Sequence, residues 1–194
     1  MDKLSYALGI SMGNNFMRSG IEKLDYSDFA AGVKAAYESD YSQMTTDTAK
    51  RVVNEFFAMM EERIKDVNKK AGEQYLAENA KRPEVRTTAS GLQYEIIKEG
   101  EGASPKPNDA VTVHYTGALI DGRVFDSSVE RGEPATFGVT QVIPGWVEAL
   151  QMMKPGAEWR IFVPSNLAYG PQGAGGIIGP NMTLIFDIKL IKVN

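Results

Sequence analysis

Apolar residues near the start of the chain recur every four positions, with polar residues between them. This is the pattern of a helix that buries one face. One stripe covers residues 4–12, and a second covers 29–37 after the cap-like pair Ser27-Asp28. Two short amphipathic helices are therefore predicted, and their apolar positions are Leu4, Leu8, Met12, Phe29, Val33 and Tyr37.

A third apolar stripe is much longer. Its members recur every three or four residues and are Val52, Phe56, Met60, Ile64, Val67, Ala71 and Tyr75. The spacing predicts a helix over 47–81, on the order of 50 Å long at ~1.5 Å per residue. Two short helices cannot cover the whole apolar face of such a helix, so we expect part of it to stay solvated or to contact another chain.

The middle of this stripe most needs cover, because Phe56-Phe57 and Met59-Met60 stand together there. A contact with a second copy of the chain would bury these side chains and make the protein a homodimer through its N-terminal helices. The alternative is an antiparallel hairpin core within one chain. The excess of apolar surface favours the dimer.

Farther along, apolar and polar residues alternate in twos, the spacing of half-buried strands. The segments that show it are 92–96, 111–115, 158–163 and 183–193. Between them, Trp146, Leu150 and Met153 share one face of a short helix that Pro155-Gly156 ends. A single short helix packed on an antiparallel β-sheet is an α+β arrangement.

Proline and glycine divide the chain at one place. All nine prolines lie at or after Pro83, and 14 of the 19 glycines lie in the same part. Both residues break helices and punctuate strands and turns, so the chain changes there from helical to β-rich. We expect an all-helical domain over 1–82, which includes the long linking helix, and a sheet domain over 83–194.

Composition excludes several classes of function. The 194 residues are 43% apolar and 24% charged, as in folded globular proteins. The net charge of -4 argues against a nucleic-acid partner, which would need clustered Lys and Arg. There is no Cys and one His, so thiol chemistry, metal sites and histidine relays have few residues to use. We expect His114 to make a structural hydrogen bond, and we expect no metal and no cofactor.

The hydropathy of the chain also bears on where it resides. No apolar run approaches the roughly 18 residues that cross a bilayer, so no membrane span is expected. The first residues lack the apolar stretch of a signal peptide, which predicts a cytoplasmic protein. The alternative is a periplasmic or cell-surface location, if a signal segment has been removed.

Large apolar residues gather near the predicted turns, with few polar atoms among them. Such residues either line a concavity or fill the core, and chain spacing does not distinguish the two. They are Tyr115, Phe125, Phe137, Val142, Ile143, Trp146, Tyr169, Ile177, Ile178 and Phe186. A hydrolase that uses an acid pair such as Asp121 and Asp126 is a weaker alternative, since five residues across a turn fix no geometry.

Five motifs hold most of these residues: Val113-His114-Tyr115-Thr116-Gly117, Gly122-Arg123-Val124-Phe125-Asp126-Ser127-Ser128, Val142-Ile143-Pro144-Gly145-Trp146, Ala168-Tyr169-Gly170 and residues 177–187. In order and spacing they resemble the FK506-binding-protein (FKBP) family of peptidyl-prolyl isomerases over about residues 88–194. Leu4-Ser5-Tyr6-Ala7-Leu8-Gly9 resembles the start of the N-terminal dimerisation module of the bacterial macrophage-infectivity-potentiator-like branch.

The resemblance implies an antiparallel sheet wrapped on the helix that carries Trp146, with the prolyl ring of the substrate on that indole. It assigns catalysis to Tyr115, Asp126, Trp146, Tyr169 and Phe186. It assigns substrate binding to Phe125, Arg131, Phe137, Val142, Ile143, Ile177 and Ile178. Arg131 is expected to pair with Asp126 or Tyr115, and Asp126 either polarises the region of the twisted carbonyl or orients these two neighbours.

The expected function is rotation of X-Pro bonds in proline-containing peptides and unfolded proteins, with folding assistance by a homodimer. Macrolide inhibitors of the FK506 type are candidate ligands. The alternative is a non-enzymatic or weakly enzymatic dimeric holdase chaperone. Three residues depart from the common family residues. Ala135 and Ala174 favour the holdase slightly, whereas Gln141, which replaces a Glu, does not. The intact set favours the enzyme and consists of Tyr115, Asp126, Trp146 and Tyr169.

Overall fold

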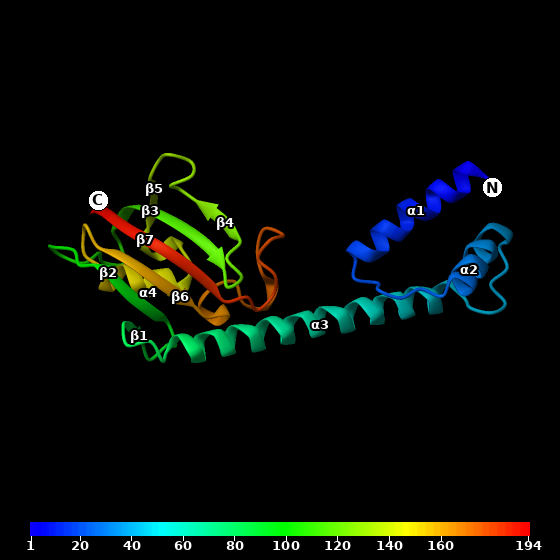
Figure 1. Ribbon diagram of the computed structural model, residues 1–194, viewed down its shortest axis with the longest axis horizontal. Helices are drawn as coiled ribbons and strands as arrows, with labels where there is room; N and C mark the ends of the chain where they lie inside the picture. The colour runs from blue at the N-terminus through cyan, green and yellow to red at the C-terminus, as the bar shows by residue number, and fades with distance from the viewer. The chain divides into compact units, whose positions relative to one another are not determined.

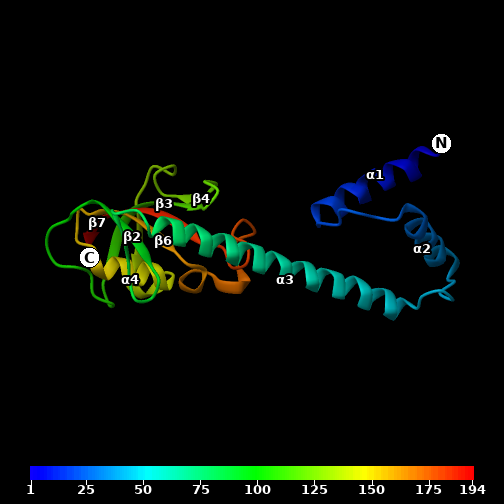
Figure 2. The ribbon, with the colours of Figure 1, turned by 60° about the horizontal axis from the view of Figure 1, so that its bottom comes forward.

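Three helices open the chain, whose residues 1–194 are all described by the computed structural model (Figure 1). They are α1 (Lys3–Arg18), α2 (Tyr26–Glu38) and α3 (Thr46–Asn79). The apolar stripes predicted all three. α3 is one uninterrupted helix of 34 residues and ends two residues before the predicted limit at Lys81 (Figure 2).

Aspartates begin the first two helices. Asp2 accepts a hydrogen bond from the N–H of Ser5 at 2.8 Å. Asp25 accepts from the N–H groups of Ser27 and Asp28 at 2.9 and 3.0 Å. A carboxylate at this position satisfies N–H groups that have no partner inside the helix. The cap of α2 is thus Asp25, two residues before the pair that the sequence suggested.

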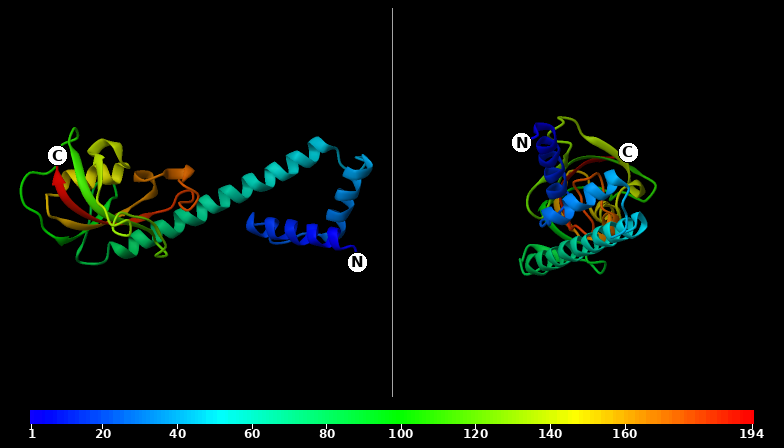
Figure 3. Two further views of the ribbon diagram at one scale, coloured as in Figure 1. Left: turned by 90° about the horizontal axis from the view of Figure 1, so that it is seen from above. Right: turned by 90° about the vertical axis from the view of Figure 1, so that its right-hand side faces the viewer.

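The apolar stripes of α1 and α2 remain uncovered within the chain. Figure 3 shows the two as separate helices joined by a short segment, and neither buries a residue. Leu4 is 69% exposed and Tyr37 is 88% exposed. Phe16 and Phe29 make one edge-to-face contact, with ring centroids 5.5 Å apart. The hairpin core considered as the alternative to a dimer is therefore not formed by a single chain.

Seven strands form one antiparallel sheet in the order β1-β2-β6-β7-β3-β4, with β5 paired to β3. They are β1 (Val85–Thr87), β2 (Gln93–Lys98), β3 (Ala110–Leu119), β4 (Val124–Ser127), β5 (Ala135–Gly138), β6 (Glu158–Val163) and β7 (Leu184–Val193). Alternation predicted β2, β3, β6 and β7. The pairing of β3 with β7 places Gly117 opposite Phe186 and Tyr115 opposite Ile188.

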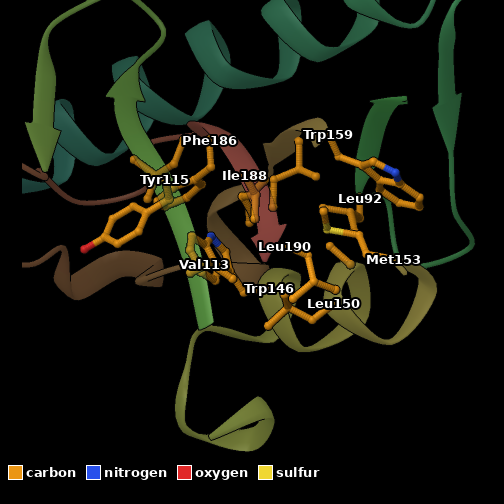
Figure 4. Packing of buried hydrophobic residues seen from close by; sticks show 14 of the residues in the cluster. Leu92, Val113, Tyr115, Trp146, Leu150, Met153, Trp159, Phe186, Ile188 and Leu190 are labelled. Atoms are coloured by element: carbon orange, nitrogen blue, oxygen red, sulfur yellow. The ribbon is translucent and has the colours of Figure 1, made fainter. Parts of the chain in front are cut away.

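The core lies between the sheet and α4 (Pro144–Met152), as Figure 4 shows. Trp146, Leu150 and Met153 all face the sheet and are at most 4% exposed, which confirms the shared face predicted for this helix. Three short 3-10 helices complete the unit: η1 (Val139–Gln141), η2 (Ser165–Leu167) and η3 (Gly170–Gln172). The α+β class expected from the sequence is confirmed.

The chain consists of two compact units, residues 1–62 and 63–194, and the boundary between them falls inside α3. The second half of α3 therefore belongs with the sheet. Asn79 Nδ2 donates to Gln93 Oε1, and Gln93 Nε2 donates to the carbonyl of Leu76, both at 2.9 Å. Asn79 and Gln93 are buried, so these bonds satisfy amide groups that would otherwise lie unpaired away from water.

Further contacts join the end of α3 to β2 and β6. The ring of Tyr75 lies 6.1 Å from that of Phe162, and Arg82 pairs with Glu95 at 2.7 Å. The expected boundary between residues 82 and 83 marks the change from helix to strand. As a boundary between parts that fold independently, it stays a prediction.

Candidate active site

A pocket of about 400 Å³ lies beside the first turn of α4. Strands β3, β4, β5 and β7, the turn that precedes α4, and the segment before η3 all contribute to it. The lining residues are Tyr115, Phe125, Asp126, Phe137, Gln141, Val142, Ile143, Trp146, Tyr169 and Phe186. Most of these side chains are aromatic or aliphatic, so the pocket suits an apolar ligand group with a few polar attachments.

Aromatic rings meet the indole of Trp146 on several sides. Tyr115 and Phe186 each stand nearly perpendicular to it with centroids 5.3 Å away, and Phe137 does so at 6.0 Å. Edge-to-face contacts of this kind are the favoured geometry of aromatic pairs. Trp146 is 4% exposed, and these three rings share it as their floor.

Two glycines allow the walls to come together. A Cβ on Gly117 would lie 2.6 Å from Phe125 and 2.8 Å from Phe186, two rings that meet edge to face at 5.6 Å. A Cβ on Gly145 would lie 2.5 Å from Val163, so glycine lets α4 begin close against β6. These glycines are required by close approach rather than by backbone conformation.

One polar cluster stands in this wall. The hydroxyl of Tyr115 donates to one carboxylate oxygen of Asp126, and Arg131 Nη1 donates to the other. Arg131 Nη2 also donates to the Tyr115 hydroxyl oxygen at 3.1 Å. Pairing of β3 with β4 brings Tyr115 and Asp126 together across the sheet. Arg131 was predicted to pair with Asp126 or Tyr115, and it bonds to both.

Burial is the largest single influence on the pKa of both Tyr115 and Asp126. It raises the pKa of Tyr115, and the hydrogen bond to Asp126 raises it further. Burial alone would also raise the pKa of Asp126. The hydrogen bonds from Tyr115 and Arg131, with the charge of Arg131, together outweigh it and hold that pKa below its ordinary value. At neutral pH Asp126 is therefore ionised and Tyr115 is a protonated donor.

Several hydrogen-bond donors of residues that line the pocket have no partner within the chain, and the buried Nε1 of Trp146 is one of them. Two others are placed for a ligand. They are the hydroxyl of Tyr169, a residue that is 41% exposed, and the backbone N–H of Ile143 immediately before α4. The N–H of a residue at this point precedes the intrahelical ladder and is left for another acceptor. Both donors can therefore bind carbonyl oxygens of a ligand.

The structure brings nine of the twelve predicted site residues to the lining of the pocket. Arg131 is not among them and acts on the wall through Asp126 and Tyr115. Ile178 is 8% exposed and packs in the core, and its N–H and C=O both bond to Ala174. Ile177 is 40% exposed and does not line the pocket.

Gln141, noted in the sequence as a replacement for a family Glu but not assigned to the site, also lines the pocket. It ends η1, and its side chain folds back against Gly138, where an added Cβ would lie 2.9 Å from Oε1. Its position directly before Val142 and Ile143 in the chain was the available signal. A polar residue beside two predicted wall residues is a natural part of the rim.

Residues outside the pocket account for other sequence features. His114 Nδ1 lies 3.1 Å from Ser128 Oγ, which confirms the structural hydrogen bond expected of it. Asp121 pairs with Arg123 at 2.9 Å and does not line the pocket with Asp126. No group of three or more His, Cys, Asp or Glu side chains is placed to hold a metal ion. None of the helices has the length and apolar character needed to cross a membrane.

Comparison with protein families divides the chain into two matches. The model of a family described as "FKBP-type peptidyl-prolyl cis-trans isomerase" matches residues 101–191. A second, described as "Domain amino terminal to FKBP-type peptidyl-prolyl isomerase", matches residues 1–96. The first match contains every lining residue of the pocket, and the second contains all three N-terminal helices.

Individual proteins are similar over nearly the whole chain. The outer membrane protein MIP of Legionella longbeachae is 47% identical, over 99% of this chain and 85% of its own. The FKBP-type 22 kDa peptidyl-prolyl cis-trans isomerase of Escherichia coli is 44% identical, over 97% and 93%. The crystal structure of FkpA from Escherichia coli superposes with a TM-score of 0.81 at 36% identity, over 99% and 95%.

Proposed function

The chain belongs to the FKBP-type peptidyl-prolyl cis-trans isomerases, and we propose that it performs the reaction of this family in the pocket above Trp146. The prolyl ring of the substrate rests on the indole, and the rings of Tyr115, Phe137 and Phe186 surround it. The observation that carries this assignment is the perpendicular packing of these three rings on one buried tryptophan.

The reaction needs no nucleophile. Rotation about an X-Pro bond crosses a barrier of ~18–20 kcal/mol, because the twisted bond loses amide resonance. Uncatalysed exchange takes tens to hundreds of seconds, and no covalent bond breaks. The reaction therefore requires a suitable shape and polarity of the pocket, and it requires no nucleophilic Cys and no metal ion.

The apolar lining favours the twisted state. As resonance is lost, the carbonyl oxygen and the nitrogen become less charge-separated than in the planar amide. A dry aromatic pocket solvates the planar form poorly and penalises the twisted form less. The buried face of Trp146 and the aliphatic side chains of Val142 and Ile143 supply this environment.

The hydroxyl of Tyr169 and the N–H of Ile143 position the substrate. The hydroxyl of Tyr169 donates to the carbonyl that precedes the proline, and the N–H of Ile143 donates to a second substrate carbonyl. Each bond restricts the chain on either side of the prolyl ring without holding the rotating bond itself. The absence of an internal partner for either group supports these roles.

For Asp126 we propose the orienting role. Tyr115 engages one of its carboxylate oxygens and Arg131 engages the other. A carboxylate held in this way fixes the ring of Tyr115 against Trp146, and its charge is already compensated by a guanidinium. Direct polarisation of the substrate carbonyl by Asp126 would have to compete with both bonds.

Exchange NMR on a short peptide with an Ala-Leu-Pro-Phe core tests the assignment. We expect the full chain to accelerate cis-trans exchange strongly and the Trp146→Ala variant to lose the acceleration. Trp159→Phe is the matched control, because Trp159 is also buried but stacks on Tyr94 outside the pocket. Absence of acceleration by the unaltered protein would favour the holdase instead.

We also propose that the protein is a homodimer that assists folding. Phe57 is 40% exposed and Met59 is 72% exposed on α3, and α1 and α2 leave their apolar faces open. A second copy of the chain would cover such surfaces. Two linked pockets would then raise the effective concentration of sites along one unfolded chain.

Light scattering on the full chain measures this directly. We expect the unaltered protein to have a mass twice the 21.3 kDa of one chain. When Phe57 and Met59 are both changed to Glu, the mass should shift toward that of one chain. Gln43→Glu, at an exposed polar position, is the control for added charge. A monomeric unaltered protein would refute the dimer.

Macrolide inhibitors of the FK506 type are proposed to bind the same pocket. Their carbonyl oxygens would take the place of substrate carbonyls at the Ile143 N–H and the Tyr169 hydroxyl. Competition between FK506 and the peptide in the exchange assay tests this, and inhibition that persists in full at saturating peptide would place the inhibitor elsewhere.

A further inference from the structure

Two asparagine side chains join α3 to the segment that precedes β7. Asn68, on α3, donates from Nδ2 to the carbonyl of Pro180 at 2.8 Å. In return, Asn181 donates from Nδ2 to the carbonyl of Lys65 on α3 at 3.3 Å. Each amide thus binds the backbone of the other's segment. We call Asn68 and Asn181 the amide clamp.

Close backbone contact surrounds the clamp. Gly72 lies one helical turn after Asn68 and is buried, and a Cβ there would lie 2.3 Å from Thr183 Oγ1. Thr183 is itself 4% exposed. The glycine therefore lets α3 approach the segment 180–183 closely enough for both amide hydrogen bonds to form.

The clamp continues to the pocket through the backbone of Asn181. Its N–H donates to the carbonyl of Gly170 at 2.8 Å, and Gly170 directly follows Tyr169 in the chain. Asn181 has a left-handed conformation (φ 55°), which asparagine tolerates better than most residues. One residue in this conformation thus contacts α3 through its side chain and the Tyr169 segment through its backbone.

The side chain of Tyr169 makes no hydrogen bond of its own, so the backbone around it sets its position. The residue is partly exposed, and its hydroxyl has no partner in the chain. It lies between η2 and η3, two 3-10 helices of three residues each. The position of its hydroxyl in the pocket therefore depends on the bonds that hold its two neighbours, which are Ala168 N–H to Ser165 C=O and Asn181 N–H to Gly170 C=O.

We propose that Asn68 and Asn181 are positioning residues of the isomerase, which hold Tyr169 in its place at the pocket. This inference rests on the proposed contact of the Tyr169 hydroxyl with substrate. It makes the second half of α3 a working part of the enzyme. A polar side chain on a helix outside the sheet domain defined by sequence then affects substrate binding.

The kinetic test compares Asn68→Ala with the unaltered full chain on the Ala-Leu-Pro-Phe peptide. Alanine is a better helix former than asparagine, so α3 itself is not weakened. The Tyr169 contact acts in the ground and twisted states alike, so its misplacement raises KM while kcat stays unchanged. Loss of one hydrogen bond suggests a rise in KM of about three- to tenfold.

Simple destabilisation would give the opposite result. A smaller folded fraction lowers the apparent kcat and leaves KM as it was. Lys69→Ala, at the adjacent exposed position of α3, is the matched control and should change neither constant. Unchanged KM in the Asn68→Ala variant, or an equal rise in the Lys69→Ala variant, would overturn the proposal.

A double variant shows whether the clamp acts through Tyr169. Tyr169→Phe removes the hydroxyl, and adding Asn68→Ala to it should raise KM little further. Fully additive effects would refute the pathway. If Tyr169→Phe alone has no effect, the proposed substrate contact fails, and the inference fails with it. If Tyr169→Phe raises KM and Asn68→Ala does not, only the clamp is refuted.

Amide hydrogen exchange provides a readout that does not depend on activity. We expect exchange across residues 170–183 to be faster in the Asn68→Ala variant, and unchanged in the Lys69→Ala variant. Exchange equal to that of the unaltered protein throughout this segment would mean that Asn68 does not hold it, and would overturn the proposal on structural grounds.

Discussion

The ring of Phe186 stands edge-on to the indole of Trp146, with centroids 5.3 Å apart and ring planes at 85°. The two residues come from β7 and α4, so their contact joins the sheet to its helix at the floor of the pocket. It also links the stability of the core to the shape of the site, because both rings are at most 4% exposed.

If the apolar floor and walls carry catalysis, Trp146→Ala and Phe186→Ala should each lower kcat/KM at least as much as Asp126→Ala. We expect a loss of at least about tenfold, equivalent to ~1.4 kcal/mol of transition-state stabilisation. Because alanine leaves a cavity, Trp146→Phe should be assayed beside Trp159→Phe, which removes an indole outside the pocket. A larger loss from Asp126→Ala than from either aromatic change would show that the charged cluster is the main catalytic element.

Acidification should weaken the folded state through Asp126. Its pKa is lowered on folding, so its contribution to stability is present above the ordinary carboxyl pKa of about 3.9 and is lost as pH falls through the folded value. Asp126→Asn should therefore be less stable than the unaltered protein at pH 7, and the difference should shrink below about pH 4. Urea unfolding at several pH values measures this. A difference that stays constant across that range would exclude the ionised form as its source.

Gly72→Ala should destabilise the protein, although alanine normally favours a helix over glycine by up to ~1 kcal/mol. The new methyl group would overlap Thr183, and such overpacking costs about 1–3 kcal/mol. Gly32→Ala in α2 is the control, because an added Cβ there meets nothing within 4 Å. Denaturant midpoints of the two variants should move in opposite directions. A stabilised Gly72→Ala variant would mean that α3 is not held closely at this point.

Two truncations separate the roles of α3. A fragment of residues 63–194 should isomerise short peptides as fast as the full chain does. It should accelerate refolding much less than the full chain when the protein substrate's refolding is limited by prolyl isomerisation. A shorter fragment, residues 83–194, should melt at a lower temperature than residues 63–194. In the shorter fragment, Gln93 lacks its buried hydrogen-bond partners Asn79 and Leu76. Thermal unfolding and the two rate assays test this. Equal melting temperatures would show that the second half of α3 does not stabilise the sheet.

The sequence predicted the elements that are long enough to show a periodic hydrophobic pattern. It missed the elements that are too short to show one. The stripe from Val52 to Tyr75 predicted α3 to within two residues at either end. Strands β1, β4 and β5 have only three or four residues, so alternation could not distinguish them from turns. They form because neighbouring strands offer them partners: β1 pairs with β2, and β4 and β5 pair with β3.

The site was predicted mainly by resemblance to the family. Its residues are brought together by the fold, and their spacing along the chain does not show which of them meet. Tyr115 and Asp126 are eleven residues apart, and only the pairing of β3 with β4 makes them partners. Ile178 was a large apolar residue in a glycine-rich loop, which fits a core residue as well as a ligand contact, and it lies in the core. Asn68 is one polar residue among many on α3, and no pattern in the sequence distinguishes it.

The shared floor of the pocket has an evolutionary consequence. Tyr115, Phe137 and Phe186 all contact the same indole, so a change of size in one ring alters the fit of the others. Substitutions there should show strong epistasis and be difficult to accumulate singly. Gln141 lines the pocket but is exposed. Substrate preference can therefore drift at this rim while the aromatic interior stays fixed.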